Sequence, residues 1–286
     1  MRGTGEIEIR LLEMRDLAGA MRLKELARWN QTEGDWLRLL KLEPRGCFCA
    51  SLDGRLVGTT TTTTYAGGLA WVGMVLVDPG CRRRGVATRL MRTALDYLEK
   101  RVAAVKLDAT TDGRPVYERF GFRVESSVER WTGTARVFDA RAAMCETFEP
   151  STPGELLALD REAFGADRSK LIEALLADAC VAPMVAAAEG RLSGYALARR
   201  GSSAAYVGPL VASDARQAAT LFDGLLGQLA GQRIYVDLNT NFERGAEVLA
   251  DRGFVKQRDL VRMAYGAPSS AASSAAVFAI AGPELG

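Results

Sequence analysis

Residues 75–87 decide the fold of this chain, and they have the sequence Val75-Leu76-Val77-Asp78-Pro79-Gly80-Cys81-Arg82-Arg83-Arg84-Gly85-Val86-Ala87. The apolar start predicts the end of a strand, Pro79 and Gly80 predict a turn, and Gly85 predicts the start of a helix. The first amide groups of a helix lack partners within it, and its dipole favours negative charge. We therefore predict a pyrophosphate site formed by Arg82, Arg83, Arg84, Gly85, Val86, Ala87 and Thr88. The alternative is a surface helix that follows a solvated basic run.

The patterns on either side of this turn predict alternating strands and helices. The first half is expected to have strands at 6–11, 47–52, 56–65, 69–77 and 104–108, and helices within 16–42, at 85–101 and at 115–120. Within 16–42, the polar and aromatic segment 28–33 predicts a loop between two helices. Six consecutive threonines, 59–64, favour an extended chain because they are β-branched, and we expect a solvated or half-buried strand.

The second half repeats this order, which indicates a tandem duplication. It has helical patterns at 164–179, 217–230 and 243–251, strand patterns at 184–188, 192–199, 205–211 and 233–238, and a last strand at 277–281. We predict an α/β fold of two tandem domains, each with a mostly antiparallel, mixed central sheet flanked by helices. The predicted domains are 1–135 and 154–286, with a linker at 136–153 and an Ala/Ser-rich crossing at 267–276.

Composition excludes several classes of function. The chain has 286 residues, 48% of them hydrophobic, and a net charge of +2, so no overall field favours a nucleic acid or a membrane as partner. The N-terminus lacks a signal-peptide core and no apolar run is long enough to span a bilayer, so we expect a cytoplasmic protein. The absence of histidine excludes an imidazole base. The five cysteines lack a metal-ligand spacing, so we expect no metal, and Cys47 and Cys49 are expected to face inward from a strand.

Two motifs in the first half resemble those of the GNAT superfamily of acetyltransferases. The first is Arg82-x-x-Gly85-x-Ala87 after an apolar strand, and the second is Tyr117-Glu118-Arg119-Phe120-Gly121-Phe122. Segments 29–32 and 107–117 look like a bacterial tandem-GNAT subgroup, and this similarity spans nearly the whole chain.

The resemblance implies an N-acetyltransferase that moves the acetyl group of acetyl-CoA directly to a small-molecule amine. Acetyl-CoA would lie between the strand that holds Leu76 and Val77 and the strand at 104–108, and would pair with the backbone of Met74, Leu76 and Val77 as an added strand does. Thr110 stands where many members have an asparagine, and it is expected to contact the cofactor together with Arg114.

In the family, the tyrosine that matches Tyr117 gives a proton to the departing thiolate. A tyrosine pKa of about 10 lies above a thiol pKa of about 8.5, so Tyr117 would act mainly by hydrogen-bonding the developing sulfur anion. The alternative is a core aromatic residue on a short helix.

The acceptor site is expected in the loop and helix near residue 30. We predict Glu33 as the catalytic base, acting through water or by holding an ammonium, and Trp29, Asn30 and Asp35 as acceptor-binding residues. Glu33 and Asp35 also suit the start of a solvated helix, and Trp29 also suits helix packing, so these alternatives stay open.

The second half departs from the motifs. Its counterpart of the anion turn, 211–218, lacks the glycine pair and carries Asp214, and its counterpart of Tyr117 is Leu249. We expect this half to bind no acetyl-CoA and to pack against the first. Two other functions stay open, a non-catalytic acyl-CoA sensor and a protein-amine acetyltransferase, and the sequence also leaves a homodimer open.

Overall fold

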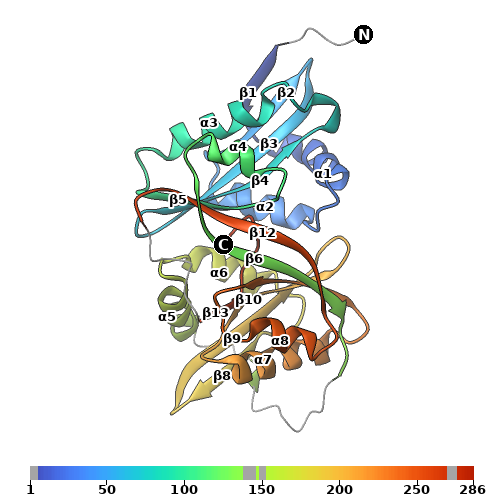
Figure 1. The fold of residues 1–286 in the computed structure, drawn as a ribbon, viewed down its shortest axis with the longest axis vertical. Coiled ribbons are helices and arrows are strands. Elements are labelled where there is room, and N and C mark those ends of the chain that lie inside the picture. Colours follow the sequence, from blue (N-terminus) through green and yellow to red (C-terminus); the bar gives the residue numbers. More distant parts are fainter. Residues whose placement is uncertain (1–5, 138–145, 148–152, 269–275) are drawn as a thin grey trace.

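The computed structural model describes residues 6–137, 146–147, 153–268 and 276–286 of the chain. The described strands form one continuous sheet of thirteen strands, in the order β1-β2-β3-β4-β5-β12-β6-β11-β13-β10-β9-β8-β7. Helices flank this sheet in two lobes, the first half of the chain above and the second half below (Figure 1). The prediction of a mixed, mostly antiparallel sheet flanked by helices is confirmed.

The elements follow the predicted order in both halves. The strands are β1 (Ile7–Leu11), β2 (Cys47–Leu52), β3 (Arg55–Tyr65), β4 (Leu69–Val77), β5 (Ala104–Ala109), β6 (Arg123–Thr134), β7 (Glu146–Thr147), β8 (Met184–Ala188), β9 (Arg191–Arg199), β10 (Ala205–Val211), β11 (Arg233–Asn239), β12 (Val255–Gly266) and β13 (Val277–Ala279). The α-helices are α1 (Leu17–Leu26), α2 (Glu33–Leu42), α3 (Val86–Leu98), α4 (Arg114–Glu118), α5 (Pro153–Phe164), α6 (Ser169–Ala177), α7 (Ala215–Gln228) and α8 (Gly245–Ala250), and short 3₁₀ turns lie at Met14–Asp16 and Pro79–Cys81.

The two halves exchange strands at the middle of the sheet. β12, from the end of the chain, lies between β5 and β6, and β6 pairs on its other side with β11 (Figure 1). The hydrogen bonding therefore crosses the predicted boundary between 1–135 and 154–286. The predicted linker and the Ala/Ser-rich crossing lie mostly outside the described residues.

A break in the strand pairing opens the sheet beside the predicted pyrophosphate turn. The parallel ladder between β4 and β5 joins Leu69–Trp71 to Ala104–Lys106 and does not continue beyond them. Further along β4 the register with β3 shifts between Thr59 and Thr61, and Met74 has a φ of 50°. The Thr59 hydroxyl donates a 2.8 Å hydrogen bond to the carbonyl of Met74 and so satisfies a backbone group at this bulge.

The C-terminal residues tie the two lobes together. β13 confirms the predicted last strand, and it lies between β10 and β11, with Ala279 paired to both Leu210 and Leu238. The chain then enters the first half, where Trp71 Nε1 donates to the carbonyl of Pro283 at 3.0 Å. The Tyr65 hydroxyl donates to the carbonyl of Leu285 at 2.7 Å, so the last residues are anchored on β3 and β4.

Three local predictions can be compared with the structure. The threonine strand is fully buried over Thr59–Thr63, with at most 2% of each residue exposed, because helices and the C-terminal residues cover faces that the sequence left unassigned. Cys47 and Cys49 are buried, as predicted. The helix expected at 164–179 is α6 alone, and α5 precedes it, because Gly165 adopts a positive φ of 81° and separates the two.

Candidate active site

A groove of about 840 Å³ runs between β4, the start of α3 and the loop after β5. Its volume lies within the range typical of small-molecule sites. The predicted site residues that line it are Trp29, Leu76, Val77, Arg82, Arg83, Gly85, Val86, Ala87, Thr88, Thr110 and Tyr117. Met74 lines a smaller cavity that adjoins the groove.

The turn before α3 brings the N-terminus of that helix to the groove. Arg83 and Gly85 adopt left-handed φ angles of 59° and 78°, and Gly85 is the N-cap of α3 without a side-chain cap. Behind the turn, Asp78 accepts from the amide of Gly80 at 2.9 Å and pairs with Arg22 at 2.8 Å. Burial opposes the ionisation of Asp78, but Arg22, the amide of Gly80 and Arg55 together outweigh burial and hold the pKa of the carboxyl below its usual value. The turn therefore offers amides and arginines to an anion.

Tyr117 lies where the groove meets the smaller cavity and lines both. The residue is 9% exposed, its ring packs edge-on to Phe122, and burial raises the pKa of its hydroxyl well above the usual value. Thr110 beside it accepts a hydrogen bond from the amide of Gly113 at 3.2 Å, which helps to fix the start of α4. A phenol with a raised pKa stays protonated near neutral pH and can donate a proton or hydrogen bond there.

Several predicted site residues lie away from the groove. Arg84 does not line it, and Arg114 forms an exposed 2.7 Å ion pair with Glu118. Glu33 is exposed in the first turn of α2 and lines neither the groove nor the adjoining cavity. Asn30 is buried, and its amide group holds the 201–204 turn of the second half, accepting from the amide of Ser203 and donating to the carbonyl of Ala204 at 2.9 Å each.

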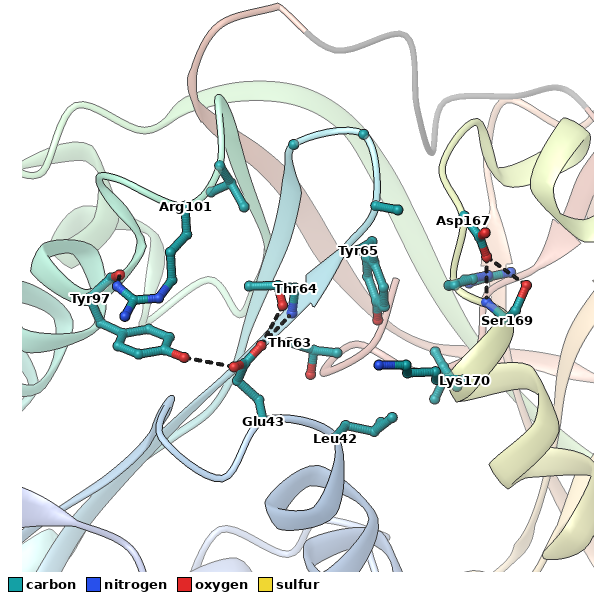
Figure 2. Close-up of a pocket in the computed structure, with 16 residues that line it drawn as sticks. Leu42, Glu43, Thr63, Thr64, Tyr65, Tyr97, Arg101, Asp167, Ser169 and Lys170 are labelled. Carbon is teal, nitrogen blue, oxygen red and sulfur yellow. Dashed lines mark hydrogen bonds between the residues drawn. The ribbon is translucent and has the colours of Figure 1, made fainter.

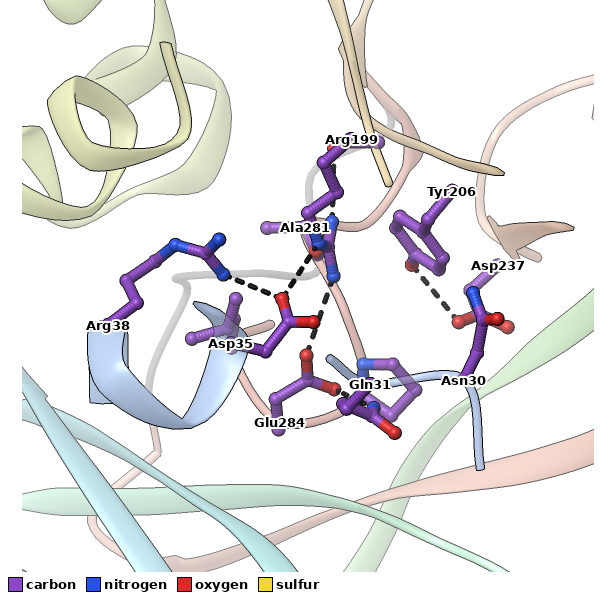
Figure 3. A network of polar contacts seen from close by, with 12 residues as sticks. Asn30, Gln31, Asp35, Arg38, Arg199, Tyr206, Asp237, Ala281 and Glu284 are labelled. Carbon is purple, nitrogen blue, oxygen red and sulfur yellow. Dashed lines mark hydrogen bonds and ion pairs between the residues drawn. The ribbon is translucent and has the colours of Figure 1, made fainter. Parts of the chain in front are cut away.

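Asp35 belongs to a buried network of charges between the two halves (Figure 3). Its carboxylate caps α2 by accepting from the amide of Thr32 at 2.7 Å, and it pairs with Arg38 at 2.8 Å and Arg199 at 3.3 Å. Burial alone would raise the pKa of this carboxyl, but Arg199 and Arg38 outweigh burial and hold the pKa below its usual value. The stabilisation from these pairs is therefore present above the unfolded-state pKa of about 3.9 and is lost as the pH falls below it.

Replacing Asp35 by asparagine is expected to lower the free energy of unfolding by about 3 kcal/mol, because two buried guanidinium groups lose a partner. Urea unfolding measures this change. The matched control is Asp178→Asn, since Asp178 pairs with the same Arg38 at 2.7 Å but has a side chain that is 49% exposed. The control is expected to cost less than about 1 kcal/mol. Equal losses in the two variants would contradict a structural role for Asp35.

The smaller cavity contains two charged residues that the sequence motifs did not indicate. It has a volume of about 40 Å³, and Gln31, Arg258 and Glu284 line it together with Tyr117. Arg258 comes from β12 and Glu284 from the C-terminal segment, so only the strand exchange brings them to Tyr117. One local signal was present in the sequence, because Gly73 inside an apolar strand suggests close approach of another segment. A Cβ at Gly73 would lie 2.6 Å from the Cα of Glu284.

A further cavity of about 720 Å³ lies elsewhere between the two halves (Figure 2). It shares no lining residue with the groove. Its carboxylates are engaged within the protein: Glu43 accepts from the Tyr97 hydroxyl at 2.6 Å, and Asp167 accepts from the Ser169 hydroxyl at 2.5 Å (Figure 2). This cavity therefore offers less reactive chemistry than the groove.

In the equivalent turn of the second half, side chains accept hydrogen bonds from the backbone amides at the start of the helix. At the start of α7 the Asp214 carboxylate accepts from the amide of Gln217 at 2.8 Å, and the Gln217 side chain accepts from the amide of Ser213 at 2.9 Å. Leu249, the counterpart of Tyr117, is fully buried. Strands β10 and β11 correspond to β4 and β5. The gap that is open between β4 and β5 is filled by β13 between β10 and β11.

Within residues 6–137, 146–147, 153–268 and 276–286, no three His, Cys, Asp or Glu side chains are grouped as metal ligands. No helix in that same part of the chain has the length and apolarity needed to cross a bilayer.

Comparisons with known proteins agree with this arrangement. The family model described as acetyltransferase (GNAT) family matches residues 11–122, and the model described as acetyltransferase (GNAT) domain matches residues 156–279. The uncharacterized N-acetyltransferase YitH of Bacillus subtilis (strain 168) is 25% identical over 263 residues, which cover 87% of this chain and 88% of that protein.

Two solved structures share the fold. The crystal structure of a proposed acetyltransferase from Pyrococcus horikoshii has a TM-score of 0.85 at 23% identity, covering 100% of this chain and 98% of that one. A tandem GNAT protein from the clavulanic acid biosynthesis pathway has a TM-score of 0.61 at 15% identity, covering 93% of this chain and 100% of that one. At these identities the likeness concerns the fold alone.

Proposed function

Because the chain belongs to the GNAT acetyltransferase superfamily and carries two GNAT domains in tandem, we propose that it is an N-acetyltransferase of a small-molecule amine. In this proposal acetyl-CoA lies in the groove of the first half and gives its acetyl group directly to the amine. The observation that carries the proposal is Tyr117, which lines both the groove and the adjoining cavity.

The turn before α3 supports binding of the pyrophosphate. The amides of Gly85, Val86 and Ala87 lie at the N-terminus of a thirteen-residue helix, whose dipole favours a negative charge. Arg82 and Arg83 are exposed beside them and add positive charge. Beyond Trp71 the edge of β4 that faces β5 is free of ladder pairing, so the backbone of Met74, Leu76 and Val77 suits an added strand-like ligand.

Tyr117 acts as the general acid in the proposed reaction. When acetyl-CoA is bound, its thioester supplies the activated acetyl group. The phenol hydroxyl is held neutral by burial, and it stabilises the sulfur anion that develops as the carbon–sulfur bond breaks. Trp29 lines both cavities and is proposed as an acceptor contact. Glu33 stays a predicted base, although its exposed position gives that role no support.

A direct test combines binding and turnover. Calorimetric titration with acetyl-CoA, followed by a panel of amines monitored through release of free thiol, separates an enzyme from an acyl-CoA sensor. Binding together with amine-dependent thiol release is the expected result. Absence of acetyl-CoA binding by the purified chain would overturn the proposal.

The second half is proposed to bind no acetyl-CoA, so one molecule is expected per chain. Asp214 places a carboxylate at the start of α7, where a bound phosphate would be repelled, and β13 fills the gap between β10 and β11. Calorimetry should therefore give a stoichiometry of one, with a single class of sites. Gly85→Glu should weaken binding at that class by at least about 100-fold. A second class that survives Gly85→Glu would mean that the second half binds the cofactor.

A further inference from the structure

We propose that Gln31, Arg258 and Glu284 form the acceptor subsite, and that this subsite selects an amine that also carries a carboxylate. The inference rests on the proposed acetyl transfer, and it deepens that proposal by assigning the class of acceptor. It also assigns to the second half of the chain a direct part in the active site, because Arg258 lies on β12 and Glu284 follows β13.

The position and size of the cavity suit the reacting end of an acceptor. It adjoins the groove, and Trp29, Tyr117 and Arg258 line both spaces. Its volume of about 40 Å³ is room for about three water molecules. An amine and its nearest atoms fit this space, while the remainder of the acceptor has to extend towards the groove.

Gln31 and Glu284 offer hydrogen-bond acceptors to an ammonium group. Glu284 Oε2 accepts from Gln31 Nε2 at 2.9 Å, and Glu284 Oε1 lies 3.4 Å from Arg199 Nη2 (Figure 3). This pairing leaves Gln31 Oε1 buried without a hydrogen-bond partner among the described residues. Buried acceptors are costly to leave unpaired, and an ammonium carries three donors. A ligand N–H that reaches Gln31 Oε1 and the Glu284 carboxylate would satisfy both.

Arg258 favours binding of an anion in the same cavity. Its Nε is buried and has no hydrogen-bond partner in the part of the chain that the structure describes. Its neighbour across the β12–β6 ladder is Arg130, whose charge is already matched by Asp237 through a 2.8 Å bond from Nε. Burial and the nearby Arg130 lower the pKa of Arg258, and Asp237 offsets them only in part. A carboxylate on the acceptor would supply the missing partner and two hydrogen-bond acceptors.

Residues of the same cavity provide a donor or an acceptor for each proton of the reaction. The ammonium gives one proton to Glu284, and the free amine attacks the carbonyl carbon of the thioester to form the carbon–nitrogen bond. As the carbon–sulfur bond breaks, the sulfur takes the Tyr117 proton, and the second amine proton replaces it on the Tyr117 oxygen. Burial raises the pKa of the Glu284 carboxyl. The charge of Asp35 adds to this effect, while the charge of Arg199 opposes it. The Glu284 carboxylate is therefore a stronger base than an exposed one.

Matched acceptors test the proposed class. The wild-type protein is assayed for thiol release with alanine, phenylalanine and β-alanine, and with the amide and the decarboxylated amine of each. For at least one amino acid, kcat/KM should exceed that of its amide and its decarboxylated amine by about tenfold or more, since each lacks the charged partner of Arg258. Equal turnover of the three forms would overturn the inference.

Variants separate the two charged groups. Arg258→Met should bring the ratio of kcat/KM for an amino acid to that for its amide close to one. Lys256→Met, an exposed change on the same strand, should leave this ratio as in the wild type. Glu284→Gln should lower kcat for every acceptor and keep the carboxylate preference. Circular dichroism and thermal melting report whether each variant is folded. A persistent preference for the carboxylate in folded Arg258→Met would contradict the assignment.

The outcomes also separate this inference from the proposed function. If acetyl-CoA binds and only amines without a carboxylate are acetylated, the acceptor class is wrong and the proposed function stands. If acetyl-CoA binds and none of the amino acids is acetylated, the acceptor class is likewise overturned. If acetyl-CoA does not bind, both fall.

Discussion

Replacing Gly85 by glutamate is expected to weaken acetyl-CoA binding by at least about 100-fold, equivalent to about 3 kcal/mol. Gly85 has a φ of 78°, a backbone conformation that costs a residue with a side chain about 1–2 kcal/mol. Its missing Cβ would meet nothing within 4 Å, so the new carboxylate has room in the groove, at the helix N-terminus where the pyrophosphate is proposed to lie. Repulsion between the two negative charges adds to the backbone strain. Calorimetric titration measures the loss.

The matched control for this variant is Gly231→Glu. Gly231 has a φ of 83°, and a Cβ there also meets nothing within 4 Å, but the residue lies after α7 and away from the groove. The control therefore carries the same strain and charge without the proposed repulsion, and its acetyl-CoA affinity should match the wild type. Equal binding by both glutamate variants would contradict a pyrophosphate at the turn before α3.

Replacing Tyr117 by phenylalanine is expected to lower kcat by about 100-fold and to leave the Kd of acetyl-CoA unchanged. The change removes the proposed proton donor and keeps the ring that packs on Phe122. The phenylalanine ring keeps the edge-on packing on Phe122, so the melting temperature should not fall. Burial raises the pKa of this hydroxyl, so the loss should be the same at every pH between about 6 and 9.

Tyr265→Phe serves as the control for Tyr117→Phe. Tyr265 also packs on Phe122, with ring centroids 5.5 Å apart, but it is 42% exposed and does not line the groove. Wild-type kcat is expected in this variant. If Tyr117→Phe turned over as fast as the control, Tyr117 would be a packing residue and the proposed general acid would have to be sought elsewhere.

Much of the groove could be predicted because its residues are close in sequence. Residues 82–88 make one turn and the start of one helix, so their amides converge whatever the rest of the chain does. Tyr117 follows after one strand and one loop, and its motif fixes its place relative to that helix. The prediction was less informative for long side chains, since Arg84 and Arg114 lie on the correct segments but do not line the groove.

The side proposed for the acceptor could not be predicted in the same way. Trp29 and Asn30 are adjacent in the loop after α1, yet Trp29 lines the groove whereas Asn30 turns to the 201–204 segment of the second half. Asp35 was placed near the acceptor, but its partner Arg199 lies 164 residues away and draws it into a buried ion network. A local sequence pattern contains no information about partners that are so distant along the chain.

The sequence by itself determined the tandem α/β fold, the position of the groove and the difference between its two halves. Those features depend on hydrophobic periodicity, glycine conformation and helix ends, which are set by neighbouring residues. Only the tertiary structure brought Arg258 and Glu284 to Tyr117, because that juxtaposition depends on which strands pair. Strand β12 pairs with β5, and the last residues hydrogen-bond to β3 and β4, through backbone groups that are chemically alike in every residue except proline.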